Sequence, residues 1–189
     1  MILVIDTSSS TAGVAVLGES PQEYLLSARS QELLPLLRRI VAESTVTGVA
    51  VATGPGSFTG LRVGVSFGLG LAVGLKIPIV PLPSLGLQAA RSERPVTAVV
   101  EAGRGRFYFQ VVGGDMRLGE PAEIPTTHPI VGRLSPAGEA ALTGAGHRLL
   151  PENELRTFAV AATILLETAN EVAYGSLEIE YMQSFRARG

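Results

Sequence analysis

The segment Ala52-Thr-Gly-Pro-Gly-Ser-Phe-Thr-Gly-Leu-Arg-Val-Gly64 decides how the first half of the chain folds. A run of small and β-branched residues at 48–52 predicts a buried strand, and the apolar stretch 58–76 predicts a helix. The glycines and proline between them are typical of a tight turn, and Ser57 stands where it can cap the helix. A strand, a glycine turn and a helix start expose backbone N–H groups that can bind a phosphate or a carboxylate. A tight turn without a ligand explains the residues equally well, because they match neither the Walker pattern nor GxGxxG.

The apolar runs on either side predict the order β-β-β-α-β-α-β-α for the first half of the chain. The expected strands lie at 2–5, 12–17, 22–27, 48–52 and 78–82, and the expected helices at 33–43, 58–76 and 84–91. The first three strands are joined by short turns, which indicates an antiparallel meander.

After residue 95 a degraded copy of the same order begins. Its expected strands lie at 96–100, 107–112, within 118–124 and at 141–146, and its helix lies at 158–172. We therefore predict a duplicated two-lobe α/β protein with lobes at 1–94 and 95–189, of which the second is reduced.

The composition is that of a soluble globular protein with 17% charged and 46% hydrophobic residues and a net charge of −2. So little charge leaves apolar surface to cover, which favours self-association or a partner. The chain has no basic excess that would bind nucleic acid by itself. The lack of cysteine excludes disulfides and thiolate metal sites. The start lacks a basic leader and the apolar run 63–75 is too short to span a membrane, so we expect a cytoplasmic protein.

Asp6 follows the first strand and precedes a hydroxyl-rich run at 7–11. Ligands of open α/β sheets bind at such strand ends, where a carboxylate and hydroxyls can orient a magnesium-bound phosphate or a water. A simple Asx or ST turn between two strands explains these residues as well. A phosphotransferase would need a second phosphate loop, for which 143–146 is a faint candidate. His128 and His147 do not have metal-site spacing, and no nucleophile elbow is present, so hydrolysis is disfavoured.

Small residues repeat every four positions along the predicted helix 58–76, at Gly60, Gly64, Gly68 and Ala72. They share one face, and each interior glycine costs about 1 kcal/mol of helix stability relative to alanine. The close approach of a second helix would offset that cost, whether it is the 33–43 helix or a helix of another molecule. We expect replacement of Gly64 or Gly68 by phenylalanine to leave the monomer folded and to block dimerisation.

Two charged positions have simple expected partners. Arg62 lies one helical turn after the glycine loop, where it reaches an anion in the loop, stays exposed or pairs with a carboxylate. Glu101 ends a predicted strand and is expected to form ion pairs with Arg104 and Arg106.

Three motifs together resemble the bacterial TsaB (YeaZ) family. They are Asp-Thr-Ser at 6–8, Gly-Pro-Gly-Ser-Phe-Thr-Gly-Leu-Arg at 54–62 and Pro-Ile-Val-Pro-Leu-Pro-Ser-Leu at 78–85. The second motif is highly specific, and the similarity covers 1–90 and thins afterwards. Glu101 stands where the family usually has an aspartate, the segment 29–35 lacks a histidine that relatives often carry, and 180–183 is a variant of the family's Tyr-Leu-Arg tail.

The resemblance implies the two-lobe fold of actin, sugar kinases and Hsp70, the ribonuclease H-like or ASKHA class. It also implies a non-catalytic scaffold that pairs with TsaD, the catalytic subunit that installs threonylcarbamoyl on the adenosine beside the tRNA anticodon. Such a scaffold recruits the ATPase TsaE, forms homodimers when alone and meets tRNA only through the complex. It needs no cofactor, and the metal-binding histidine pair of TsaD has no equivalent in this sequence.

The resemblance assigns two sets of residues. A weak or vestigial phosphate-side cleft would consist of Asp6, Ser8, Gly54, Gly56 and Ser57. A pairing surface on the first two helices would consist of Leu33, Leu34, Leu37, Val63, Gly64, Phe67, Gly68 and Leu75. The alternative is an active enzyme, either a small phosphotransferase or ATPase of the same fold or a glycoprotease-like peptidase. A kinase would bind ATP and magnesium by itself and would lose activity in Asp6→Asn.

Overall fold

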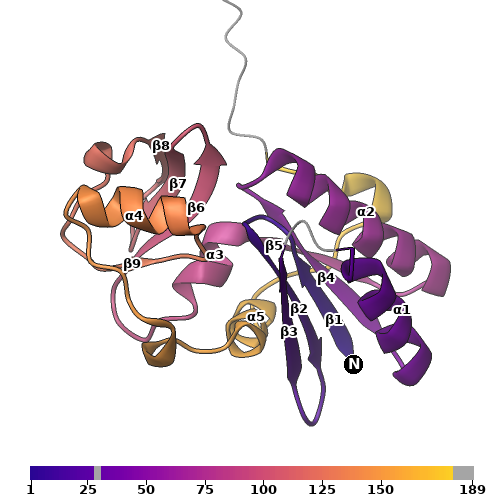
Figure 1. The fold of residues 1–189 in the computed structure, drawn as a ribbon. Helices are drawn as coiled ribbons and strands as arrows, with labels where there is room; N and C mark the ends of the chain where they lie inside the picture. Colours follow the sequence, from indigo (N-terminus) through magenta and orange to yellow (C-terminus); the bar gives the residue numbers. More distant parts are fainter. Residues whose placement is uncertain (28–30, 181–189) are drawn as a thin grey trace, which may run out of the picture.

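Two β-sheets with helices packed on their faces form the molecule (Figure 1). The structure is a computed structural model and describes residues 1–27 and 31–180. The first sheet has the order β3-β2-β1-β4-β5. Its strands are β1 (Ile2–Asp6), β2 (Thr11–Leu17), β3 (Gln22–Ser27), β4 (Gly48–Gly54) and β5 (Ile79–Pro83). β2 runs antiparallel to β1 and β3, whereas β1, β4 and β5 are parallel. The expected meander and the element order of the first half are therefore confirmed.

Helices cover both faces of this sheet. Alternation along β1 sends Leu3 and Ile5 towards α1 (Leu33–Glu43) and α2 (Phe58–Leu75), and sends Val4 towards the opposite face. α1 and α2 lie on the same face of the sheet (Figure 1). The opposite face is covered by α3 (Ser84–Ala89) and α5 (Phe158–Leu166). β4 is buried throughout because helices cover it on both sides.

The second sheet has the order β8-β7-β6-β9. Its strands are β6 (Thr97–Gly103), β7 (Arg106–Val111), β8 (Met116–Gly119) and β9 (Ile130–Val131). α4 (Pro136–Gly144) packs on one face and α3 on the other. Short 3-10 turns lie at Pro121–Glu123, Glu152–Glu154 and Tyr174–Ser176. α3 therefore lies between the two sheets, with Leu85 against the second and Leu87 against the first.

The sequence predictions fail in part of the second half. The strand expected at 141–146 is wrong, because most of these residues belong to α4. Pro136 opens that helix, and the Ser135 hydroxyl caps it by accepting a hydrogen bond from the Gly138 N–H at 3.1 Å. The faint phosphate-loop candidate at 143–146 therefore lies at the end of a helix. α5 ends at Leu166, six residues before the expected 172.

The division into lobes at 1–94 and 95–189 separates the two sheets, and we keep it as a proposal. α5 packs on the first sheet although it follows the second sheet in the chain. Residues 29–30 of the segment before α1 and residues 181–183 of the family-like tail lie outside the described residues.

α2 is the central apolar helix of the fold. By length and composition it could cross a membrane, a test that the core helix of a soluble protein also passes. It packs along the first sheet through Leu61, Gly64, Val65, Gly68 and Ala72. Packing on the sheet accounts for the apolar residues on one side of α2. It does not account for the apolar residues on the side that faces away from the sheet.

Candidate functional site

The structure brings four of the five expected cleft residues together where β1 and β4 end. The Ser57 N–H donates a hydrogen bond to the Ser8 carbonyl at 2.7 Å. A methyl group built on Gly56 would lie 2.5 Å from that same carbonyl oxygen. Asp6 Oδ1 accepts a hydrogen bond from the Ser8 N–H at 2.9 Å, which is the Asx turn that the sequence allowed. The glycine loop thus packs directly on the turn that follows β1.

Gly54 faces a different neighbour. Its φ of +124° favours glycine, and a methyl group there would lie 2.7 Å from the Glu180 carbonyl oxygen. The Glu180 N–H also donates to the Thr53 carbonyl at 2.8 Å. Gly54 therefore contacts a segment more than 120 residues later in the chain, and the structure does not group it with Asp6.

The start of α2 uses its own backbone donors. Ser57 Oγ accepts a hydrogen bond from the Gly60 N–H at 3.2 Å, so the predicted helix cap is present. The Ser57 N–H, which a bound phosphate would use, is already bonded to Ser8. This internal bonding weakens the site as an anion-binding site.

Asp6 and Ser8 are fully buried, yet Asp6 Oδ2 and Ser8 Oγ have no hydrogen-bond partner among the described residues. Burial lowers the pKa of the Arg133 guanidinium, and the negative charge of Asp6 opposes that shift. The Asp6 carboxylate is therefore compensated in part by a buried arginine of the same chain. Within residues 1–27 and 31–180, no cluster of three or more His, Asp or Glu side chains is placed to hold a metal ion.

Of the other two charged candidates, Arg62 is exposed, as the sequence allowed, whereas Glu101 has a partner other than the expected ones. The Arg62 guanidinium lies 3.8 Å from the centre of the Phe58 ring, on the exposed side of α2. The Glu101 carboxylate accepts hydrogen bonds from Ser135 at the start of α4, at 3.1 Å from the backbone N–H and 2.6 Å from the hydroxyl. The expected ion pairs of Glu101 with Arg104 and Arg106 are wrong, because this carboxylate binds Ser135, the residue that caps α4.

The glycine stripe of α2 faces β4 and the residue that follows β1. Methyl groups built on Gly60 and Gly64 would lie 2.0 Å from the Thr7 carbonyl oxygen and 2.2 Å from Thr7 Oγ1. One built on Gly68 would lie 2.1 Å from a methyl of Val51 in β4. The close approach predicted from the stripe exists, but its partner is the sheet of the same chain. Gly64 and Gly68 are therefore buried inside the molecule and are corrected as partner-binding residues.

The remaining pairing residues separate into a buried and an exposed group. Leu33 and Leu37 are buried in the core of the first lobe. Leu34, Val63 and Leu75 are 39%, 38% and 42% exposed, and Phe67 is half-buried. Leu33 and Leu37 were predicted as partner-binding residues, but α1 is amphipathic and both positions lie on the side that faces the sheet.

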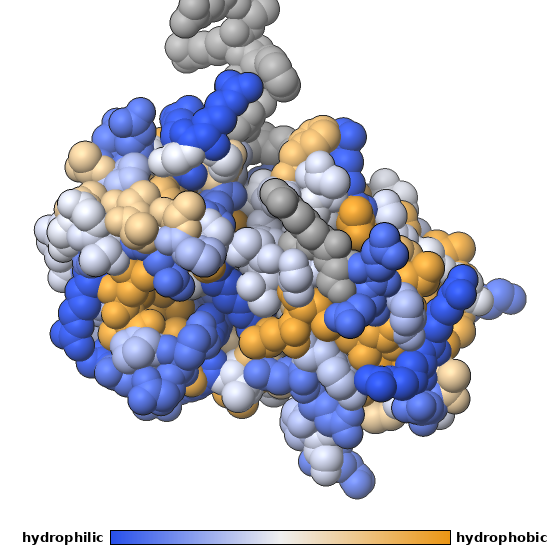
Figure 2. Space-filling model, viewed as in Figure 1, coloured by the Kyte–Doolittle hydropathy of each residue, from blue (hydrophilic) through white to orange (hydrophobic). Residues whose placement is uncertain are grey.

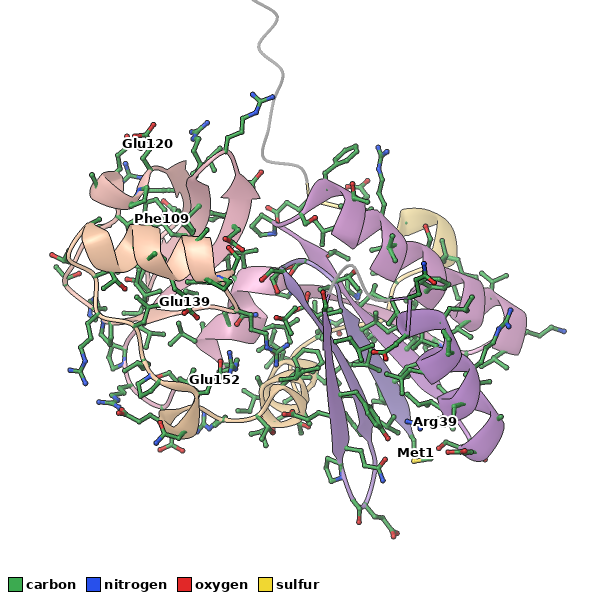
Figure 3. The ribbon with its side chains drawn as sticks, viewed as in Figure 1. Met1, Arg39, Phe109, Glu120, Glu139 and Glu152 are labelled. Atoms are coloured by element: carbon green, nitrogen blue, oxygen red, sulfur yellow. The ribbon has the colours of Figure 1, made fainter. Side chains whose placement is uncertain are left out.

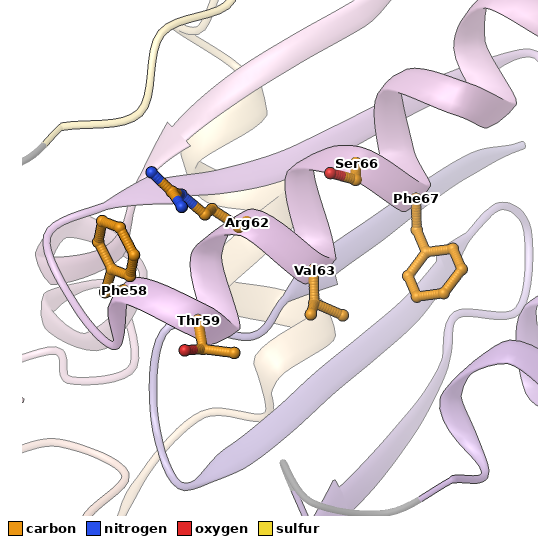
Figure 4. A pocket seen from close by; sticks show the side chains of 6 residues that line it. All are labelled: Phe58, Thr59, Arg62, Val63, Ser66 and Phe67. Atoms are coloured by element: carbon orange, nitrogen blue, oxygen red, sulfur yellow. The ribbon is translucent and has the colours of Figure 1, made fainter.

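An apolar surface runs along the exposed side of α2. A hollow of about 520 Å³ is lined there by Phe58, Thr59, Arg62, Val63, Ser66 and Phe67. Figure 4 shows Val63 and Phe67 projecting from the same side of the helix. Figure 2 shows apolar side chains at the surface over α1 and α2. We call Leu34, Phe58, Val63, Phe67 and Leu75 the helix surface. Phe58, which is 53% exposed, was not among the residues predicted for this surface, although the single charge in an 18-residue helix is a signal for an apolar surface.

The chain is similar to proteins of tRNA modification. A family model described as TsaD, tRNA N6-adenosine threonylcarbamoyltransferase, matches residues 24–127. The tRNA threonylcarbamoyladenosine biosynthesis protein TsaB of Haemophilus influenzae is 34% identical over 125 residues, which cover 59% of this chain and 53% of that protein. The TsaB of Bacillus subtilis is 34% identical over 120 residues, which cover 57% and 52%. The chain thus spans about half the length of the curated relatives it matches.

A solved structure titled YeaZ from Pseudomonas aeruginosa superposes with a TM-score of 0.71 at 23% identity. The superposition covers 96% of this chain and 99% of that one. Together with the two mixed sheets and the family match, it confirms the expected actin-like α/β fold.

Proposed function

The chain belongs to the TsaB (YeaZ) family, within the wider TsaD-type family, and on that premise we propose that it takes part in tRNA threonylcarbamoyladenosine biosynthesis. Its role is that of a non-catalytic scaffold in the cytoplasm. It pairs with a TsaD-like catalytic subunit, supports recruitment of a TsaE-like ATPase and meets tRNA only through that complex. Alone, it pairs with a second copy of itself.

The exposed apolar side of α2, with Val63 38% and Leu75 42% exposed, is the observation that carries this proposal. The helix has 18 residues, five of them buried, and Arg62 is its only charged residue. Exposed apolar surface of this kind is unfavourable in water and is typical of an interface. α1 lies beside α2 and adds Leu34 to the helix surface. Two neighbouring helices offer ridges and grooves into which two partner helices can pack as a four-helix bundle.

The state of the cleft supports a role without catalysis. The backbone donor at Ser57 is bonded to Ser8, and Arg133 compensates the buried charge of Asp6 in part. A phosphotransferase needs both groups available to the nucleotide and its magnesium. The cleft residues Asp6, Ser8, Gly54, Gly56 and Ser57 therefore have the character of a structural junction, as a vestigial site would.

The pairing surface can be tested by placing a charge on it. Val63→Glu and Phe67→Glu should leave the fold intact by circular dichroism, because both side chains reach solvent. They should abolish the homodimer in size-exclusion chromatography with light scattering, and co-elution with the TsaD-like subunit. The matched control is Val112→Glu, whose side chain is 54% exposed beyond the end of β7, away from the helix surface. A folded Val63→Glu variant that still forms the homodimer and still binds the TsaD-like subunit would refute the proposed surface.

Catalysis by the chain alone is tested separately. ATP hydrolysis should be at background level for the purified chain and unchanged in Asp6→Asn. Threonylcarbamoylation of tRNA should require the chain together with its two partners. Turnover of ATP by the chain alone, lost in Asp6→Asn, would favour the phosphotransferase alternative. Cleavage of a protein substrate would favour the peptidase.

A further inference from the structure

The chain passes between its two lobes at two places, and the two crossings lie side by side. The outward crossing, 90–96, follows α3, and the return crossing, 151–157, leads to α5. The Arg156 N–H donates to the Arg91 carbonyl at 2.8 Å, and Arg91 Nε donates to the Arg156 carbonyl at 3.4 Å. Arg156 Nη1 donates to the Ala90 carbonyl at 3.3 Å. A hinge needs backbone that is free to rotate, whereas these crossings are bonded to each other.

Three ion pairs join the same two segments. Arg91 pairs with Glu152, Arg94 with Glu154, and Arg156 with Glu93, the last at 2.9 Å. Arg91 is the buried member of this set, with a side chain that is 3% exposed. Figure 3 shows Glu152 at the junction of the two lobes. Each acid and its arginine lie on opposite crossings, so every pair holds the outward and the return segment together.

Arg133 makes a second connection between the lobes. It follows β9 of the second sheet and is 6% exposed. Its guanidinium carbon lies 4.8 Å from the centre of the Phe158 ring in α5. A methyl group built on Gly13 of β2 would lie 2.5 Å from Arg133 Nη1. Glycine at this position therefore gives the guanidinium room to lie against the first sheet.

The charges around Arg133 come from the first lobe and from the two crossings. Asp6, Glu23 and Glu152 favour its positive charge, and Arg91 opposes it. The Glu23 carboxylate also accepts the Ala159 N–H at 2.9 Å, which ties β3 to the start of α5. Opening the lobes would separate the buried cation from these acids and from the Phe158 ring, and exposing α3 would add apolar surface to water.

We propose that the paired crossings and the wedged Arg133 lock the two lobes at one fixed closure, so that the chain acts as a rigid body and does not open and close around a ligand. This lock does not depend on the helix surface or on the family's reaction. Proteins that close around a nucleotide need a hinge between their lobes. In this chain the two segments that could serve as the hinge, 90–96 and 151–157, are hydrogen-bonded and ion-paired to each other.

The distance between the lobes can be measured directly. The chain contains no cysteine, so Ser20→Cys in the β2–β3 turn and Glu139→Cys in α4 provide two exposed sites for nitroxide labels. Pulsed electron spin resonance on the otherwise unchanged chain should give one narrow distance distribution. Adding ATP with magnesium should leave that distribution unchanged.

Three substitutions then remove the lock in the labelled chain. Arg91→Met, Arg133→Met and Glu152→Gln should each broaden the distribution at least twofold in width or add a second, longer distance. Glu152 is 70% exposed at its side chain, so Glu152→Gln tests the crossing without disturbing the core. Arg148→Met, at an exposed arginine of the second lobe, is the matched control and should not change the distribution.

Two results would overturn the proposal. One is a broad or bimodal distribution in the parent chain, which is informative even if a variant fails to fold. The other is a distribution that stays narrow in folded Glu152→Gln and Arg133→Met, which would assign the fixed closure to α3 alone.

Discussion

The packing of α2 on the sheet leads to a sharp prediction for two glycines two residues apart. A methyl group at Gly68 would lie 2.1 Å from a methyl of Val51, whereas one at Gly70 would meet nothing within 4 Å. Val51 is fully buried in β4 and cannot move aside without disturbing the core. Gly68→Ala should therefore destabilise the protein, and Gly70→Ala should stabilise it.

The magnitude follows from two opposing effects. Ordinary carbon contacts lie at about 3.5–4.0 Å, so the helix must move by roughly 1.5 Å to accept the Gly68→Ala methyl group. Overpacking of this kind lowers the free energy of unfolding by about 1–3 kcal/mol. The higher helix propensity of alanine raises it by up to about 1 kcal/mol. We expect a net loss of about 1–2 kcal/mol for Gly68→Ala and a gain of about 0.5–1 kcal/mol for Gly70→Ala.

The assay is urea unfolding followed by circular dichroism, with all proteins at one concentration because the proposed dimer would add to the measured stability. In thermal unfolding the two variants should differ by at least about 3 °C, since 1 kcal/mol corresponds to about 2–4 °C for a chain of this size. Equal stability of the two variants would refute the reasoning, because it would mean that α2 is not seated on β4. By the same argument, Gly68→Phe should prevent folding, contrary to the expectation from sequence that it would only block dimerisation.

The remaining predictions concern the second lobe. Glu101→Ala should cost about 1–2 kcal/mol, because it removes both hydrogen bonds that hold Ser135, the cap residue of α4. Faster hydrogen exchange confined to α4 would report the weakened helix start, and unchanged exchange would contradict this prediction. Burial raises the pKa of the Tyr108 phenol above 10.0, and Arg106 opposes the shift. The unfolded chain therefore loses this proton at lower pH than the folded chain, so stability should be constant below about pH 10 and fall above it. Tyr108→Phe should reduce that fall in urea titrations between pH 8 and 11, and an unchanged slope would exclude Tyr108 as its source.

Some functional positions could be predicted from sequence because their signals are local. Ser57 caps α2 as expected, since the serine and the N–H it accepts lie three residues apart. Asp6 and Ser8 form an Asx turn for the same reason. Their meeting with the glycine loop was also predictable, because β1 and β4 are parallel neighbours whose carboxyl ends share one edge.

Other positions could not be predicted because their partners are distant in the chain. The partner of Glu101 is Ser135, 34 residues later. The segment 141–146 was expected to be a strand because its residues are small and weakly periodic, although Ser135 and Pro136 are local signals for the start of a helix. The role of Arg133 could not be predicted from the sequence, because its neighbours Gly13 and Phe158 are far from it in the chain.

The sequence by itself determined the strand, loop and helix around 52–64, the order of the first sheet's elements and the family. It determined them because periodicity, turn residues and caps act over a few positions. Only the tertiary structure decided that the glycine stripe faces β4 and the end of β1, that the helix surface is exposed, and that the two crossings are bonded together. A periodic pattern predicts which side chains share a face of a helix. What covers that face depends on contacts between residues far apart in the chain.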